Sequence, residues 1–370
     1  MTTTERATRT IINLNAIASN VAAVRSVIGP RRDLMAVVKA DAYGHGAVNV
    51  SRTALESGAT CLGVALPEEG AFLRSGGIEA PILVLGVIHP KEASKVVQSR
   101  LEQTLCTLEL AEALNQAGEA SSGKISVHVK VDTGMGRIGL APRDTMAFVQ
   151  KISRHKNLHL KGIFSHLPCA DHADKTFTRG QIELFSGLVR EIVASGVKIP
   201  QKHLANSAGI LDFPESCFDL VRPGIMMYGL YPSPHVSRSV ALKPAMTLKT
   251  RIAYLKRVPA ETPISYGHTF CCEKSMHIAT LPIGYADGYS RGLSNRGYAM
   301  IRNQHASLVG RVCMDMCMFD VTDIKDIQPG DEAVLFGEKP TVDELADQLD
   351  TINYEIVCSI GKRVPKIFVT

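Results

Sequence analysis

Apolar and polar residues follow two different patterns along the chain. Up to about residue 229, short apolar runs alternate with longer segments in which apolar residues recur every three or four positions. The longer segments predict helices, one of which covers 13–28 with Asn13 as its N-cap and Gly29 and Pro30 at its end. The short runs predict buried strands at 35–39, 61–65, 82–86, 102–106, 125–131, 159–165, 202–205 and 218–221.

About eight strands that alternate with helices predict the α/β class, and this number of units is that of a closed (β/α)₈ barrel. An open, doubly wound sheet is the weaker interpretation, because no GxGxxG sequence follows the first predicted strand.

The pattern changes after Gly229. Residues 230–246 contain three prolines and several serines, a composition typical of a linker. The alternating apolar runs beyond them predict a mostly β domain, with one helix at TVDELADQLD that Thr341 and Glu344 open as a capping box. We therefore expect a barrel over residues 1–240 and a C-terminal β domain over 241–370.

Composition narrows the class of protein. A chain of 370 residues that is 45% hydrophobic buries a large core, and its net charge of +5 comes from scattered Lys and Arg, which argues against a nucleic-acid partner. No apolar stretch follows MTTTERATRT, and the run PILVLGVI is far shorter than the roughly 20 residues that span a bilayer. Nine cysteines without zinc-site spacing predict reduced thiols, no metal and a cytoplasmic location.

VVKADAYGHG, residues 37–46, places Lys39 at the end of an apolar run. A buried ammonium costs several kcal/mol or loses its proton. Lys39 therefore either reaches water from the strand end or serves as a desolvated amine, as a nucleophile or a base. Active sites of barrels lie at the C-terminal ends of the strands, which favours the second interpretation.

Polar side chains follow the other predicted strands as well, and all of these strand ends meet at the same rim of a barrel. Each one alone has an ordinary explanation as a surface charge, a helix cap or an ion-pair partner, but their coincidence predicts an active site. They are Arg137 in DTGMGRIG, His166, Asn206, Ser207 and Arg222.

Two glycine-containing motifs, ANSAGI and RPGIMMYG, follow the last two strands, where barrels often bind phosphate. They offer the Ser207 hydroxyl and the backbone amides near Gly224 and Ile225. A phosphate site beside a strand-end lysine suggests pyridoxal 5'-phosphate held as a Schiff base on Lys39. A Schiff-base aldolase, which needs the lysine and the phosphate site but no cofactor, is the alternative.

The chain resembles the alanine racemases over nearly its whole length. The motifs that carry the resemblance occur in the family's order: VVKADAYGHG, VDTGMGRIG, LANSAGIL, VRPGIMMYG, ISYGHTF, LPIGYADGY, GRVCMDM and INYEIVCSIGKRVP. The resemblance implies a homodimer with shared active sites that interconverts L-alanine and D-alanine for cell-wall peptidoglycan. It also implies two-base proton transfer at the Cα of an amino acid attached to pyridoxal phosphate.

The resemblance further assigns roles to individual residues. Lys39 and Tyr266 are the two bases, and Arg222 faces the pyridine nitrogen with His166 behind it. Lys130 is either a carbamylated lysine that orients Arg137 or an ordinary lysine of the barrel wall. The implied cofactor-binding residues are Lys39, Tyr43, His166, Asn206, Ser207, Arg222, Gly224, Ile225 and Tyr354, and the implied substrate-side residues are Arg137, Tyr285, Met314 and Asp315.

Elementary chemistry agrees with these roles. Racemisation removes a proton from one face of Cα and returns one to the other, so two bases on opposite faces are the simplest solution. A tyrosine needs a nearby cation to act as a base near neutral pH, and Arg137 is the candidate. An arginine only donates hydrogen bonds, so Arg222 keeps the pyridine nitrogen unprotonated, which weakens the electron sink and disfavours transamination.

Three alternatives share the barrel: a pyridoxal-phosphate carrier or homeostasis protein, a decarboxylase, and a racemase that acts on serine. Carriers lack the second domain, whereas ISYGHTF, GYADGY and CMDM lie beyond the linker. Decarboxylases use loops that this sequence does not contain. Tyr266, Tyr354 and Met314 would crowd the space for a substrate side chain, which suits the methyl group of alanine.

Overall fold

The computed structural model describes residues 6–120 and 123–370. They divide into two compact units. One unit consists of Ala16–Ala42 and Gly46–Lys243, and the other consists of Pro244–Thr370 with the N-terminal segment through Asn15 and with Tyr43–His45. The first five residues of MTTTERATRT, which entered the prediction of location, lie outside the described residues.

The first unit is built on eight parallel strands in the order β8-β7-β6-β5-β4-β3-β2-β9. The sheet closes between its two edges, because the Asp219 amide donates to the Lys202 carbonyl at 3.0 Å and the Arg222 amide donates to the Ala205 carbonyl at 3.0 Å. The eight predicted strands are thus confirmed, with shifts at their ends. Their bounds are β2 (Asp33–Val37), β3 (Cys61–Val64), β4 (Ile82–Val84), β5 (Glu102–Leu105), β6 (Ile125–Lys130), β7 (Leu158–Phe164), β8 (Gln201–His203) and β9 (Leu220–Val221).

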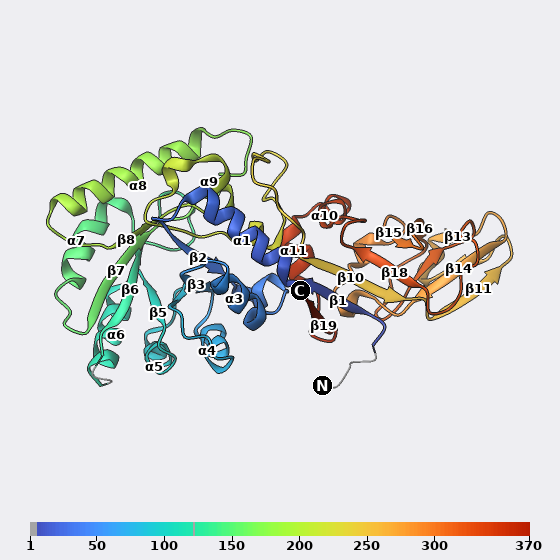
Figure 1. Cartoon of the computed structure of the whole chain (residues 1–370), viewed down its shortest axis with the longest axis horizontal. Coiled ribbons are helices and arrows are strands. Elements are labelled where there is room, and N and C mark those ends of the chain that lie inside the picture. Colours follow the sequence, from blue (N-terminus) through green and yellow to red (C-terminus); the bar gives the residue numbers. More distant parts are fainter. Residues whose placement is uncertain (1–5, 121–122) are drawn as a thin grey trace. The chain divides into compact units, whose positions relative to one another are not determined.

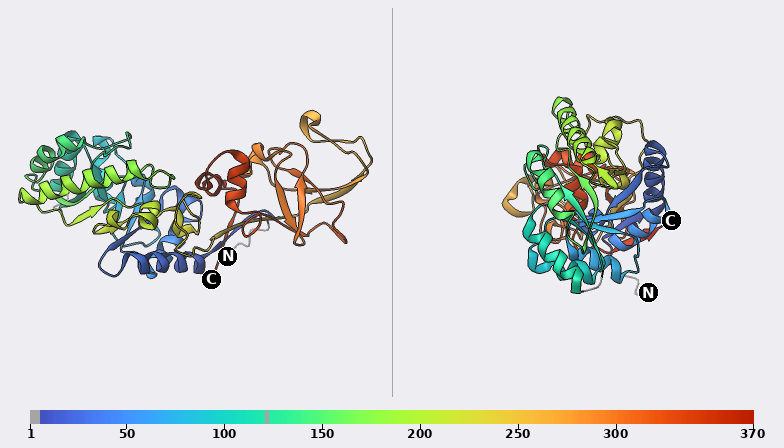
Figure 2. Two further views of the ribbon diagram at one scale, coloured as in Figure 1. Left: turned by 90° about the horizontal axis from the view of Figure 1, so that it is seen from above. Right: turned by 90° about the vertical axis from the view of Figure 1, so that its left-hand side faces the viewer.

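Helices form the outer layer around these strands (Figures 1 and 2). The predicted helix 13–28 is observed as α1 (Leu14–Ile28), and its buried residues include Ile17, Val21 and Val24. Asn13 ends a strand directly before it. The other helices are α3 (Ala47–Glu56), α4 (Pro67–Ser75), α5 (Ala93–Gln98), α6 (Leu108–Ala120), α7 (Pro142–Ile152), α8 (Thr176–Ala194) and α9 (Ser207–Asp212), with short 3₁₀ turns η1 (Pro90–Glu92), η2 (Pro214–Ser216) and η3 (Ile225–Tyr228).

The predicted linker 230–246 is hydrogen-bonded within itself and to the barrel. The Tyr231 hydroxyl donates to the Val240 carbonyl at 2.6 Å, and the Lys243 amide donates to the Asn20 side chain at 2.8 Å. Residues through Lys243 therefore belong to the barrel unit.

The second unit is mostly β, as predicted. Its nine-stranded sheet has the order β11-β14-β17-β16-β15-β18-β10-β1-β19, and β12 pairs with β13 apart from it. Neighbouring strands run antiparallel except β1 and β19, which are parallel. The bounds are β1 (Arg9–Asn13), β10 (Met246–Arg251), β11 (Tyr254–Val258), β12 (Pro263–Ile264), β13 (Phe270–Cys271), β14 (Met276–Leu281), β15 (Tyr298–Ile301), β16 (Gln304–Leu308), β17 (Cys317–Asp320), β18 (Glu332–Phe336) and β19 (Lys366–Val369).

Two helices and three 3₁₀ turns complete this unit. In α10 (Val342–Leu349) the predicted capping box is confirmed, because the Glu344 amide donates to Thr341 Oγ1 at 3.1 Å and the Thr341 amide donates to Glu344 Oε2 at 2.6 Å. The other elements are α11 (Asn353–Cys358), η4 (Tyr266–His268), η5 (Tyr285–Asp287) and η6 (Arg291–Leu293). In the described ranges, no helix combines the length and the apolar character that crossing a membrane requires.

Candidate active site

Lys39 opens a turn of unusual backbone conformation. Strand β2 ends at Val37, two residues before the predicted end, and Lys39 begins α2 (Lys39–Tyr43). The residues after Lys39, from Ala40 to Tyr43, have φ between 51° and 54°, so four consecutive residues other than glycine are left-handed. Such a conformation costs roughly 1–2 kcal/mol per residue. The surrounding structure must therefore hold this turn in place.

Two carboxylates hold it. Glu69 Oε1 accepts the Ala40 amide at 2.6 Å, while Glu69 Oε2 accepts the Ala65 amide at 2.7 Å. Asp41 Oδ1 accepts the Ala47 amide at 2.7 Å, where the next helix begins. Glu69 was not among the predicted site residues, and the sequence signal for it is the acidic first turn of a helix that directly follows strand β3.

The two motifs expected to bind phosphate meet at one hydroxyl. Ser207 begins α9, and its Oγ accepts the amides of Gly224 at 2.9 Å and Met226 at 3.4 Å. Asn206 caps the same helix, because its Oδ1 accepts the Gly209 amide at 3.0 Å. Serine and glycine thus form the small, donor-rich corner that a phosphate group requires.

This corner is hydrogen-bonded to the strand that precedes Lys39. The Tyr228 hydroxyl donates to the Val37 carbonyl at 2.8 Å, and the Val37 amide donates to the Pro223 carbonyl at 3.3 Å. Val37 is the last residue of β2. The Lys39 turn and the Ser207–Gly224 corner therefore start from adjacent backbone at the rim.

Cations converge on this rim. Burial lowers the pKa of half-buried His166 well below its ordinary value, and the positive charges of Arg222, Lys130, Arg137 and Lys39 lower it further. All four cations are thus close enough to His166 to act on its titration. Cationic side chains gathered at the rim favour an anionic ligand.

Lys130 is buried in the wall of the barrel, where its Nζ donates to the Val131 carbonyl at 3.0 Å. Burial, followed by the charge of Arg222, lowers the pKa of the Lys130 amine to about 7. A large fraction of this amine is therefore uncharged near neutral pH.

Arg222 is also buried, and burial lowers its pKa to about 9, so the guanidinium stays protonated near neutral pH. Its NH1 lies 2.9 Å from His203 Nδ1, and its NH2 donates to the carbonyls of Ser165 at 2.7 Å and Leu204 at 3.0 Å. We expected His166 behind Arg222, but the histidine in hydrogen-bonding contact is His203. Within residues 6–120 and 123–370, no hydrogen bond uses Arg222 Nε.

In the second unit, Tyr266 is displayed on a strained turn. Its side chain is 70% exposed, and the flanking residues Ser265, Gly267 and His268 have φ of 68°, 71° and 47°. The turn is fastened by the Ser265 hydroxyl, which donates to the Arg311 carbonyl at 2.6 Å.

Tyr285 and Met314 belong to the same group of loops. The amides of Tyr285 and Ala286 donate to the carbonyls of Cys313 and Met314, both at 3.0 Å. The two segments touch at Gly284, where a Cβ atom would lie 2.2 Å from the Cys313 carbonyl oxygen. Glycine is therefore required for this close approach.

Asp315 joins this group through an arginine. Arg363 donates to Asp315 and, at 2.6 Å, to buried Asp287, which Arg6 also contacts at 2.6 Å. Arg363 thus links the loop of Asp315 to the turn of Tyr285. The structure brings these predicted substrate-side residues together in one unit, while Arg137 lies in the barrel unit.

Tyr43 and Tyr354, which were predicted to hold phosphate, also lie together. Their ring centroids are 5.9 Å apart, and a Cβ atom on Gly44 would lie 2.3 Å from the Val357 carbonyl oxygen of α11. Burial raises the pKa of Tyr43. Its hydroxyl is therefore a neutral hydrogen-bond donor.

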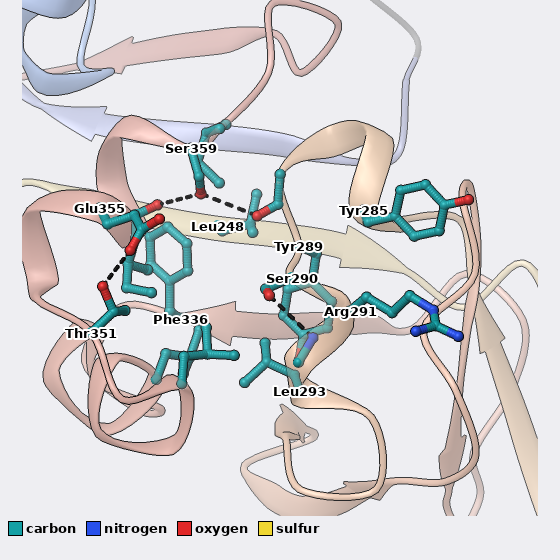
Figure 3. A pocket seen from close by; sticks show the side chains of 16 residues that line it. Leu248, Tyr285, Tyr289, Ser290, Arg291, Leu293, Phe336, Thr351, Glu355 and Ser359 are labelled. Atoms are coloured by element: carbon teal, nitrogen blue, oxygen red, sulfur yellow. Dashed lines mark hydrogen bonds between the residues drawn. The ribbon is translucent and has the colours of Figure 1, made fainter. Parts of the chain in front are cut away.

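A cavity of about 530 Å³ lies within the second unit (Figure 3). Its wall combines apolar side chains such as Leu248, Leu293 and Phe336 with polar ones such as Ser290, Thr351 and Glu355. Figure 3 shows Tyr285 and Arg291 at one side, directed away from Phe336. In the described part of the chain, no three His, Cys, Asp or Glu side chains are grouped so as to hold a metal ion.

A closed barrel whose rim combines a lysine turn, a serine–glycine corner and nearby cations is the arrangement expected of an enzyme site for an anionic ligand. Comparison with known proteins specifies the class. Residues 12–232 match the family model described as the alanine racemase N-terminal domain, and residues 245–368 match the alanine racemase C-terminal domain.

Individual proteins agree with the family models. An alanine racemase from Desulforamulus reducens is 45% identical over 97% of this chain and 98% of its own length, and one from Methanococcus maripaludis is 43% identical over 96% and 97%. The solved alanine racemase of Clostridium difficile 630 has a TM-score of 0.94 at 35% identity and covers 98% of this chain and 96% of its own. The enzyme from Bacillus anthracis, solved with bound L-Ala-P, has a TM-score of 0.92 at 34% identity and covers 99% and 95%. The chain belongs to the alanine racemase family.

Proposed function

We propose that the protein is a pyridoxal 5'-phosphate-dependent racemase that interconverts L-alanine and D-alanine and supplies D-alanine for cell-wall peptidoglycan. The observation that carries this proposal is the Lys39 turn fastened beside the Ser207–Gly224 corner, in a chain related to alanine racemases over nearly its full length.

The residues at the rim fit the cofactor. Ser207, Gly224 and Ile225 would hold the phosphate, with Asn206 fixing the start of α9. Arg222 is a buried donor with an unused Nε, which suits the pyridine nitrogen, and Lys39 would hold the cofactor covalently through its amine. On the family's motifs, we assign His166, Tyr43 and Tyr354 to the same cofactor.

Bound pyridoxal phosphate supplies an electron sink that acidifies the Cα proton of an attached amino acid. Lys39 then removes or returns this proton on one face, and the Tyr266 hydroxyl does so on the other. Positioned acids and bases of this kind contribute about 10²–10⁴ in rate each. Arg222 keeps its proton and only donates, so it holds the ring nitrogen unprotonated and limits side reactions.

Arg137 would bind the substrate carboxylate and support Tyr266 as a base. Lys130, whose amine is partly uncharged near neutral pH, would react with CO₂ and orient Arg137 as a carbamate. Tyr285, Met314 and Asp315 would form the substrate side together with Tyr266.

The β unit exposes several of these side chains, which supports a homodimer with shared sites. Tyr266, Met314 and Tyr285 are 70%, 52% and 42% exposed, and large apolar side chains gathered at a surface mark an interface. We assign this surface to the barrel mouth of a second copy, so that Tyr266 of the partner subunit completes each site.

The test is a turnover assay with enantiomer analysis. Purified protein is incubated with each L-amino acid in turn, and the enantiomer ratio is followed by chiral chromatography. We expect L-alanine to reach an equal mixture of enantiomers, serine to react much more slowly, and a Lys39→Ala control to do neither. Borohydride should fix the cofactor on Lys39, and an adduct on another lysine would contradict the mechanism.

The same assay decides between the proposal and a pyridoxal-phosphate carrier. A carrier would be yellow and would form the Lys39 adduct, but it would leave every amino acid in its starting configuration. The cluster of Tyr266, Tyr285, Met314 and Asp315 beyond residue 244 favours the racemase.

A further inference from the structure

Arg222 is the last member of a line of hydrogen-bonded side chains that crosses the barrel interior. His203 Nδ1 lies 2.9 Å from Arg222 NH1, and His203 Nε2 lies 2.9 Å from His128 Nδ1. His128 Nε2 lies 3.1 Å from Glu102 Oε2, and the other oxygen of Glu102 accepts a hydrogen bond from Lys161. The line runs from the first residue of β5 to the last residue of β8 and on to the rim.

The guanidinium of Arg222 and the carboxylate of Glu102, at the two ends of this line, determine which ring nitrogen of each histidine carries the proton. A guanidinium can only donate, so His203 Nδ1 must accept and His203 Nε2 must carry the proton. His128 Nδ1 then accepts, and His128 Nε2 carries the proton that it donates to Glu102. An ionised carboxylate can only accept, so the line is complete when both histidines are neutral.

The surroundings favour neutral rings. Burial lowers the pKa of His128, and burial and then the charge of Arg222 lower the pKa of His203 well below its ordinary value. Burial alone would raise the pKa of Glu102, but this pKa lies below its ordinary value, because the hydrogen bonds of His128 and Lys161 and the charge of Lys161 act against burial. Each group thus has the protonation state that the line requires.

The backbone of strands β6 and β7 leaves room for the side chains of this line. Strands β6 and β7 shift register at this point, with Val127 opposite Leu160 but His128 opposite Gly162. The skipped residue is Lys161, and a bulge of this kind redirects a side chain, here toward Glu102. A Cβ atom on Gly162 would lie 2.1 Å from His128 Nδ1, so only glycine leaves room for the ring.

We propose that Glu102 is a positioning residue for Arg222, because its carboxylate fixes the tautomers of His128 and His203 that allow His203 to accept from the guanidinium. The inference rests on the proposed function for its consequence, which is that Arg222 stays directed at the cofactor ring. Without the carboxylate, the Lys161 ammonium that donates to its other oxygen is left as a donor on the side of His128 Nε2, and His128 avoids two opposed donors by turning its proton to Nδ1. His203 then carries its proton on Nδ1, where it opposes a donor of Arg222.

The primary test reads the tautomers by ¹⁵N NMR of histidine-labelled holoenzyme, in which bare and protonated ring nitrogens resonate far apart. Single substitutions assign His128 and His203. We expect protons on Nε2 of both rings in the parent protein. Glu102→Leu should move the proton of His203 to Nδ1, raise pyruvate formation from alanine relative to racemisation, and slow racemisation about tenfold, the loss expected for one hydrogen bond to a charged group.

Glu102→Gln keeps an acceptor but places its amide donors against Lys161. We expect an intermediate effect, and we expect the double variant Glu102→Gln/Lys161→Met to restore the parent tautomers, because the conflict between donors is gone. If Glu102→Leu does not fold, Glu102→Gln and the double variant still test the proposal.

The ion pair of Lys175 and Asp212 supplies a matched control in the same unit. The side chains of Lys175 and Asp212 are 22% and 12% exposed, against 21% and 13% for Lys161 and Glu102, and the pair lies outside the line to Arg222. Asp212→Asn should lower the melting temperature by a similar amount without changing the tautomers or the side reaction.

Two results would overturn the proposal. One is a proton on His203 Nδ1 in the parent protein. The other is a Glu102→Leu or Glu102→Gln protein that loses stability while its tautomers and product ratio stay as in the parent, as a merely structural role would give. The tautomer measurement does not depend on turnover. A parent protein without racemase activity would contradict the proposed function, and the NMR result would still test the line of hydrogen bonds.

Discussion

The barrel rim and the loops of the β unit reach a reactive arrangement by opposite routes. At the rim, Arg222, Lys130 and His203 are buried. Burial lowers all three pKa values, and the charge of Arg222 lowers those of Lys130 and His203 further. In the loops, Tyr266 and Met314 are exposed and are held by backbone turns. The side chains of the rim are therefore held and electrostatically tuned by their own chain, whereas those of the loops are positioned by the backbone but left exposed.

The largest effect is expected from mixed dimers, which test whether the rim of one chain works with the loops of another. Lys39→Ala and Tyr266→Phe homodimers should each lose at least about 10³-fold in racemisation, because every site in either lacks a base. Random exchange of subunits makes half of the dimers mixed, and each mixed dimer has one site with both bases. Activity should therefore rise to roughly a quarter of the parent value.

Native mass spectrometry checks that the mixed dimers have formed. A mixture of Lys39→Ala with itself under the same exchange conditions is the control and should stay inactive. Mixed dimers without a rise in activity would place both bases in one chain and refute the shared site.

Arg222→Glu tests the rim alone. A carboxylic group can share a proton with the ring nitrogen, so it should strengthen the electron sink, slow racemisation about a hundredfold and raise transamination. The measurement is pyruvate and pyridoxamine phosphate formed from alanine. Arg222→Lys keeps a donor and should slow racemisation without raising side products; equal side products from both variants would reduce Arg222 to a positioning role.

Much of the rim could be predicted from the sequence because charged and polar residues directly follow the apolar runs that form the strands. A lysine or arginine at the end of an apolar run is conspicuous, and parallel strands bring their ends together. His128 and Lys130 share one face of β6 by simple alternation, yet His128 was not singled out, since its partners Glu102 and His203 lie on strands distant in sequence.

The left-handed turn after Lys39 was not predictable from residue types. Ala40, Asp41, Ala42 and Tyr43 are not residues that favour positive φ, apart from a mild tendency of aspartate. The strand was therefore extended to residue 39. The N-terminal strand β1 was likewise missed, because its partners β10 and β19 are more than two hundred residues away.

We expect carbamate formation on Lys130 to depend on pH and to have a smaller effect on activity than the changes above. Only the uncharged amine attacks CO₂, and the lost proton goes to solvent as the nitrogen–carbon bond forms. With a pKa of about 7, Lys130 should take up ¹³CO₂ at pH 8 and progressively less as the pH falls below 7, since protonation removes the nucleophile.

A ¹³C carbamate signal measures this uptake, with Lys130→Met as the blank, and the loss of the group should lower kcat/KM for alanine several-fold through a less ordered Arg137. A site that stays unlabelled at pH 8 in fully active enzyme would identify Lys130 as an ordinary lysine of the wall.

Glu69→Gln probes the rim's backbone and should have the smallest effect. Glu69 accepts the Ala40 amide on one oxygen and the amides of Ala65 and Leu66 on the other, so the glutamine amide must oppose a donor on one side. The free energy of unfolding should fall by about 1–2 kcal/mol, measured by urea denaturation of the holoenzyme, and kcat should fall a few-fold as the Lys39 turn loosens.

The neighbouring Glu68→Gln is the control, because it removes an equal charge from the same helical turn. Glu68 is exposed and pairs only with Lys95 among the described residues, so its substitution should change stability by less than about 0.5 kcal/mol. Equal shifts for the two variants would show that the charge of this helix end matters, and that Glu69 does not hold the turn.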